Sequence, residues 1–251
     1  MLLQSLSLFA LLLFGMTGLA QSSSDFVAAV EQAHQKKKFD KYDYVAFDLQ
    51  LFFGGKERFN GRVYSTTNSS AIRLDYEDGT RLVFDGQKCY SNKEKTSEQS
   101  WIFDLFTWQY FFVAPYKFSD PGTVWQFKGP AQLNDKDYET AKLTFEPGTG
   151  VSHRDWYLAY ADNNQQLRAM SYIVTLGKST EEANQEPHAI TYEAFQTVKG
   201  IPFATNWAFW DWSAEAGLSN QLGEAKIQNI ILGKKQGDLF QIQDRDLVIW
   251  E

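Results

Sequence analysis

The side chains best suited to acid–base chemistry in this sequence are Lys178, Glu186 and His188, which bracket a polar, acidic stretch. If that stretch folds back toward Asp155, a carboxylate and an imidazole would lie together at the mouth of a sheet. A general acid–base pair requires hydrogen-bond contact between its members, which spacing alone does not establish. A hydrogen-bonded loop clamp accounts for the same residues. No catalytic residue is therefore assigned, and Asp155, Lys178 and His188 are predicted to form a polar rim.

Two short motifs resemble catalytic signatures but have the wrong spacing. Gly177-Lys178-Ser179-Thr180 looks like the end of a phosphate loop, but Tyr172 stands where that loop requires its first glycine. His153-Arg154-Asp155 is similar to a kinase catalytic loop, yet Tyr160 occupies the position of the metal-binding asparagine. The G-x-S-x-G sequence of a serine nucleophile is also absent from the chain. A hydrolase centred on His188 would therefore lack a recognisable nucleophile.

The pattern of possible metal ligands is equally sparse. His34, His153 and His188 are far apart in the sequence and form no H-x-x-x-H pattern. Asp135 and Asp137 lie in a turn that lacks the glycine and the further oxygen ligands of a calcium loop. We therefore expect neither a metal ion nor another cofactor.

Charge and composition exclude some classes of protein. The 251 residues carry a formal charge of −7, which argues against binding to nucleic acid because that requires a clustered basic face. Aromatic residues make up 16% of the chain, which favours a β-rich protein with a large apolar core. Cys89 is the only cysteine, so an intrachain disulfide is impossible, and we expect its side chain to be buried.

The first 20 residues resemble a secretory signal peptide. Leu8 to Phe14 form an apolar segment, and Gly18-Leu19-Ala20 supplies small residues for cleavage near Ala20. An uncleaved anchor is the alternative, although the apolar run is short for a membrane span. No cysteine follows the small residues, so we expect export to the periplasm or the exterior without lipid attachment through cysteine. Residues 21–251 show no linker composition and are predicted to form one domain.

The most aromatic stretch runs from Trp101 to Trp125. Asp104 is a suitable N-cap, and Pro115 prevents continuation, so the pattern predicts a short helix that ends near Val113. This helix is apolar on almost every side and must be covered on most of them. It is expected either to fill the core beneath a sheet or to form the lid of an apolar cavity.

The rest of the chain favours β-strands. From Tyr42 the apolar residues recur with a period of two, so Val45, Phe47, Leu49 and Leu51 share one face. Tight turns with glycine, asparagine or aspartate separate this segment from many further alternating segments. A short edge element is expected within residues 238–251. The predicted fold is mainly β (α+β): a curved antiparallel sheet, or open half-barrel, whose concave face is covered by a few short helices.

Several segments carry a resemblance to a known family. Phe59-Asn60-Gly61-Arg62-Val63-Tyr64, Ile72-Arg73-Leu74-Asp75 and Val83-Phe84-Asp85-Gly86 resemble the strand meander of LolA/LolB-type proteins. The whole chain is similar to a family of exported proteins of unknown function near that fold, through segments such as Asp120-Pro121-Gly122-Thr123. The resemblance implies a half-barrel plugged by helices and a concave face that holds lipoprotein acyl chains. The cysteine that the LolB branch carries after its signal peptide is missing here.

We predict an exported, non-enzymatic protein that binds an apolar or lipid-like ligand, such as a lipoprotein acyl chain. We expect it to be a monomer that can associate with the cell envelope. The predicted apolar groove consists of Phe47, Leu49, Leu51, Leu105, Trp108, Phe112, Trp125, Trp156 and Trp207. The first alternative is a carbohydrate-binding or envelope-scaffold module, since Trp210 and Trp212 would face away from Trp207 on a strand. The second alternative is a hydrolase centred on His188.

Overall fold

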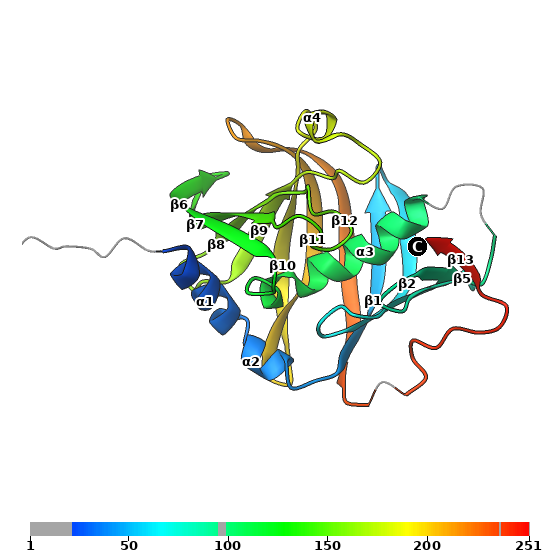
Figure 1. Cartoon of the computed structure of the whole chain (residues 1–251). Coiled ribbons are helices and arrows are strands. Elements are labelled where there is room, and N and C mark those ends of the chain that lie inside the picture. Colours follow the sequence, from blue (N-terminus) through cyan, green and yellow to red (C-terminus); the bar gives the residue numbers. More distant parts are fainter. Residues whose placement is uncertain (1–21, 95–98, 236, 251) are drawn as a thin grey trace, which may run out of the picture.

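One curved antiparallel sheet forms the body of the molecule (Figure 1). The computed structural model describes residues 22–94, 99–235 and 237–250, and all thirteen strands within these ranges belong to this sheet. Their spatial order is β13-β5-β4-β3-β2-β1-β12-β11-β10-β9-β8-β7-β6. The bounds are β1 Tyr44–Phe53, β2 Lys56–Thr66, β3 Ile72–Tyr76, β4 Arg81–Phe84, β5 Cys89–Ser91, β6 Thr123–Leu133, β7 Lys136–Phe145, β8 Tyr157–Ala161, β9 Leu167–Tyr172, β10 His188–Val198, β11 Ile201–Ser213, β12 Gly217–Gly233 and β13 Leu247–Trp250. The sheet stays open between its edge strands β13 and β6, which confirms the predicted half-barrel.

Two runs of hairpins build this order. Strands β1 to β5 and β6 to β12 each follow one another through the sheet, and β12 returns beside β1, where Leu49 lies opposite Ile227. Gly54 and Gly55 make the tight β1–β2 turn with φ values of +54° and +74°, a backbone region in which glycine carries no steric cost. The C-terminal strand β13 pairs with β5, as expected of a short edge element.

Four α-helices and one 3₁₀ turn occur in the described ranges, and their bounds are α1 Ser23–Ala33, α2 Lys36–Phe39, α3 Gln99–Val113, η1 Ala114–Tyr116 and α4 Thr180–Ala183. Helix α3 crosses the concave face of the sheet and contacts β2, β3 and β4, whereas α1 packs on β6 and β7 (Figure 1). Pro115 ends α3 as predicted, because α3 gives way to η1 after Val113.

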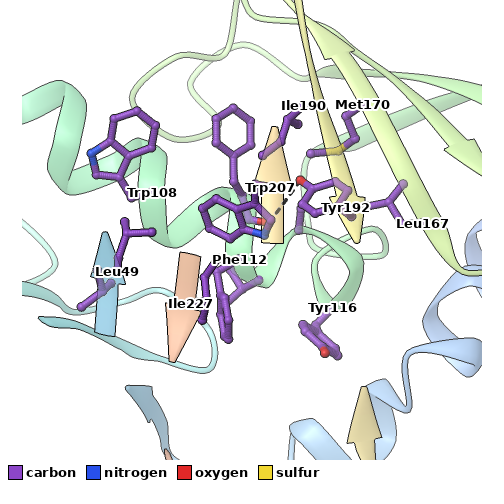
Figure 2. Packing of buried hydrophobic residues seen from close by; sticks show 14 of the residues in the cluster. Leu49, Trp108, Phe112, Tyr116, Leu167, Met170, Ile190, Tyr192, Trp207 and Ile227 are labelled. Atoms are coloured by element: carbon purple, nitrogen blue, oxygen red, sulfur yellow. Dashed lines mark hydrogen bonds between the residues drawn. The ribbon is translucent and has the colours of Figure 1, made fainter. Parts of the chain in front are cut away.

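The core lies between the sheet and α3. All four apolar residues on one face of β1 are buried, and the ring of Phe47 stacks on Phe112 of α3 with centroids 3.9 Å apart. Phe112 also stacks on Phe203 of β11 at 5.1 Å. Figure 2 shows Trp108 and Phe112 directed among residues of β1, β11 and β12, and the Tyr192 hydroxyl donating to the carbonyl of Phe111 at 3.2 Å. The predicted burial of Cys89 is confirmed.

Asp104 anchors α3 to the sheet rather than capping its N-terminus. The helix begins at Gln99, so the predicted N-cap role is wrong, and the carboxylate of Asp104 is buried inside the helix packing. Arg58 of β2 donates two hydrogen bonds to it at 2.8 and 2.9 Å, the Tyr76 hydroxyl of β3 donates at 2.8 Å, and Trp108 Nε1 donates at 2.9 Å. A buried carboxylate is tolerated only when it is paired and hydrogen-bonded in this way. The network therefore fixes α3 on two strands.

We expect Arg58→Met to lower the free energy of unfolding by about 3–5 kcal/mol, because it leaves the Asp104 carboxylate buried without its counter-ion. Urea unfolding followed by circular dichroism measures this change. Arg62→Met is the matched control, since Arg62 pairs with Asp48 at the surface and is expected to cost less than about 1 kcal/mol. Equal effects of the two substitutions would contradict the anchoring role.

His34 at the end of α1 is held neutral by its surroundings. Its Nε2 accepts a hydrogen bond from the backbone N–H of Leu167 at 3.0 Å, and the rings of Tyr116 and Phe195 each lie 5.9 Å away. Burial and, to a lesser extent, the positive charge of Arg168 lower the pKa of His34 to about 3. Protonation would charge a buried ring and remove its acceptor atom.

The stabilisation that depends on neutral His34 is predicted to be complete above pH 6.5 and to be lost as the pH falls toward about 3. Within that window, the free energy of unfolding of the wild-type protein should fall by about 1.4 kcal/mol per pH unit more steeply than that of His34→Gln. Denaturant unfolding of both proteins across this pH range provides the measurement. Parallel pH profiles would show that His34 titrates normally in the folded state.

Candidate functional site

The face of α3 that points away from the sheet core borders a cavity of about 380 Å³. Phe103, Phe106, Thr107 and Tyr110 recur at helical spacing along this face and line the cavity, whereas Leu105 and other residues of the opposite face are fully buried in the core. The volume lies within the range of about 300–1,000 Å³ that is common for small-molecule sites. The helix therefore has two apolar faces, one in the core and one toward a space.

Strands from both halves of the sheet supply the walls of this cavity. The apolar lining from β3, β4 and the segments around β7, β8 and β9 consists of Ile72, Phe84, Phe145, Tyr157, Tyr172, Val174 and Leu176. The β2–β3 turn and the loop of residues 149–152 complete the rim together with residues between η1 and β6. A mainly apolar lining with few polar groups is typical of a ligand pocket.

Three charged residues border the cavity: Lys117, Asp120 and Asp155. Lys117 and Asp120 pair with each other, with Nζ and Oδ2 2.5 Å apart. Oδ1 of Asp155 accepts hydrogen bonds from the backbone N–H of Thr175 at 2.8 Å and from its hydroxyl at 2.6 Å. Burial raises the pKa of the Asp155 carboxyl, although the bonds from Thr175 oppose that shift.

The nine residues predicted for an apolar groove lie elsewhere. Seven of them are buried in the core between the sheet and α3: Phe47, Leu49, Leu51, Leu105, Trp108, Phe112 and Trp207. Phe112 and Trp207 border a void of about 10 Å³, which has room for no more than a water molecule. None of the nine borders the larger cavity, so ligand contact by these residues stays a prediction.

Trp125 and Trp156, the other two predicted groove residues, are half-buried at separate places. The ring of Trp125 lies 4.3 Å from Phe118, near α1. Trp156 lies beside Trp212 at 6.1 Å, and its Nε1 donates to Asn184 Oδ1 at 2.9 Å. The polar stretch between β9 and β10 thus does fold back beside Trp156.

Of the predicted polar rim, Asp155 borders the cavity, whereas Lys178 and His188 do not. Lys178 pairs with Glu186 at 2.9 Å at the surface. Nδ1 of His188 lies 3.7 Å from Asp211 Oδ1, and burial lowers the pKa of His188. The carboxylate that accompanies the imidazole is therefore that of Asp211 rather than that of Glu186.

The aromatic side chains of β11 alternate as predicted. Trp207 and Phe209 are buried on the core side, whereas Trp210 and Trp212 are half-buried. Nε1 of Trp210 donates to the Thr191 hydroxyl at 3.2 Å. Within the described ranges no group of three or more histidine, cysteine or acidic residues converges as a metal site, and no helix there combines the length and hydropathy required to cross a bilayer.

The helical spacing of Phe103, Phe106, Thr107 and Tyr110 could have identified one wall of the cavity from the sequence. A helix that is apolar all round must be covered on both faces, and these four residues lie together on the face opposite Leu105. Tyr157 and Tyr172, in contrast, alternate like core residues of ordinary strands. Only the tertiary arrangement brings them to the cavity.

Comparison with solved structures identifies similar folds at low sequence identity. A LolA superfamily protein from Nitrosomonas europaea superposes with a TM-score of 0.57 and 12% identity, covering 90% of this chain and 99% of that one. A DUF1329 family protein from Desulfovibrio piger gives 0.54 and 11%, with 86% and 96% coverage. A Vibrio parahaemolyticus domain described as an outer membrane lipoprotein-sorting protein gives 0.50 and 10%, with 85% and 96% coverage.

At the level of sequence, no protein-family model and no curated protein matches the chain. The similarity concerns the fold, which in this chain is an open antiparallel sheet with helices on its concave face. The chain thus has the LolA-like fold.

Proposed function

We propose that this protein is an exported, non-enzymatic binding protein that holds an apolar or lipid-like ligand, such as an acyl chain, in the cavity over α3. The observation that carries the proposal is the cavity of about 380 Å³ lined by Phe103, Phe106 and Phe84. Each methylene group buried there would stabilise binding by about 0.8 kcal/mol, so an acyl chain need not be fully enclosed.

Two further observations support this function. Two solved structures with a similar fold carry names from the LolA superfamily and from lipoprotein sorting. The predicted signal peptide of residues 1–20 lies outside the described ranges and supports an exported protein by its sequence. An acyl-bearing lipid or lipoprotein of the cell envelope is the ligand that agrees both with the fold and with export.

Thr107→Trp is expected to weaken the binding of a fluorescent acyl probe at least tenfold, or about 1.4 kcal/mol, because the indole would occupy the cavity. Thr107 is half-buried on the cavity side of α3, and threonine and tryptophan have similar helix propensities, so the fold should persist. Titration of the probe into each protein measures the change.

Thr197→Trp is the matched control, since Thr197 is exposed on β10 and does not border the cavity. Its affinity for the probe should equal that of the wild type. Tight probe binding by the Thr107→Trp variant would place the ligand elsewhere, and the absence of probe binding by the wild type would refute the proposed function.

A further inference from the structure

Three tyrosines line the cavity without using their hydroxyl groups in the protein. Tyr110 of α3, Tyr157 of β8 and Tyr172 of β9 pack in a row, with ring centroids 5.3 Å and 6.1 Å apart. Tyr157 and Tyr172 are only 9% and 7% exposed. In the part of the chain that the structure describes, none of the three hydroxyls has a hydrogen-bond partner, whereas the Tyr116 hydroxyl donates to the Pro202 carbonyl at 2.6 Å.

The hydroxyl oxygens of the three tyrosines are accessible from the cavity, and a hydroxyl group there is normally hydrogen-bonded, because an unmet hydrogen bond costs about 1–3 kcal/mol. Burial also raises the pKa of Tyr110 and Tyr172, so both phenols stay protonated and able to donate. The contents of the cavity therefore supply their partners: water in the empty protein, and the ligand once it displaces that water. A purely apolar ligand would leave them unmet.

Asp155 adds an acceptor to the same end of the cavity. Its Oδ1 is engaged by Thr175, while its Oδ2 has no partner among the described residues. Since Lys117 and Asp120 neutralise each other, Asp155 is the remaining charged residue of the lining. An anionic group beside it would be repelled more strongly than in water, because the surroundings have a low dielectric constant.

The opposite end of the cavity is apolar. Ile72 and Phe84 belong to β3 and β4, which the sheet order separates from β8 and β9 by β2, β1, β12, β11 and β10. Phe84 packs against Phe106 of α3 with centroids 5.0 Å apart. Two polar side chains of the lining bond to each other, since the Ser69 hydroxyl donates to Gln109 Oε1 at 3.0 Å. The cavity therefore has one polar and one apolar end.

We propose that the cavity selects an amphiphile whose head group is uncharged and carries hydroxyl groups, as glycerol does in a monoacylglycerol. The head group would accept hydrogen bonds from the tyrosines and donate to Asp155, and its acyl tail would lie over Phe103 and Phe106 toward Phe84. This inference rests on the proposed function and specifies the class of ligand at that same site.

Competition against a fluorescent acyl probe tests the selection with monolaurin, laurate and dodecylamine, all below their critical micelle concentrations and at neutral pH. These compounds share a tail and differ in the charge of the head group. The full mature chain is expected to bind monolaurin at least tenfold more tightly than laurate, and also more tightly than dodecylamine, whose ammonium group can pair with Asp155 but cannot accept hydrogen bonds from the tyrosines. Asp155→Asn keeps Oδ1 as an acceptor for Thr175, and it should reduce the preference over laurate several-fold.

Tyr157→Phe removes one hydroxyl and should weaken monolaurin binding about 2- to 12-fold, the range expected for one hydrogen bond. Tyr64→Phe is the matched control, because Tyr64 lies between the guanidinium groups of Arg62 and Arg73 outside the cavity. Thermal unfolding of each variant verifies that it is folded. If Asp155→Asn fails to fold, Tyr157→Phe still decides the outcome.

Tighter binding of laurate or dodecylamine than of monolaurin would overturn the inference and leave the apolar cavity in place. Equal affinities that are unaffected by Asp155→Asn and Tyr157→Phe would overturn it as well. Failure of the wild type to bind the probe and all three compounds would refute the proposed function itself.

Discussion

The buried carboxylate of Asp104 determines how α3 lies on the sheet. Arg58 and Tyr76 reach it from β2 and β3, and Trp108 reaches it from the next turn of the helix. The side chain of Asp104 is only 1% exposed, so α3 cannot rotate on the sheet without leaving this buried charge unpaired. Apolar packing is non-directional and would not by itself fix one orientation of α3, so the pairing of Asp104 sets that orientation. Packing of Phe112 against Phe47 and Phe203 reinforces the same orientation.

Once the orientation is set, the two apolar faces of α3 have different roles. The face with Leu105 and Trp108 fills the concave side of the sheet, where both side chains are buried. The face with Phe103 and Tyr110 looks toward strands of both halves of the sheet and toward loops, and these leave a space beside it. Helix α3 is thus both the plug of the half-barrel and the floor of the cavity. The two interpretations of the aromatic stretch, core and lid, apply to opposite faces of one helix.

The sheet was predictable from the sequence because its determinants are local. The alternation of Val45, Phe47, Leu49 and Leu51 predicts the buried face of β1, and Pro115 predicts the end of α3. The role of Asp104 was not predictable, because its partners lie 46 and 28 residues away and a helix start was the simpler local interpretation. The location of the cavity was not predictable from the sequence for the same reason. Period and hydropathy identify apolar residues, but only tertiary packing decides whether a neighbouring side chain or an empty space lies against them.

The proposed function requires an acyl-bearing ligand in the space beside the outer face of α3. Mass spectrometry of organic extracts from the full-length protein, purified without detergent from cells with intact membranes, tests it most directly. The account predicts an acyl-bearing lipid in near-stoichiometric amount, which the Thr107→Trp protein should lack. Repeated extracts free of lipid, together with a crystal structure in which side chains fill the cavity, would contradict it.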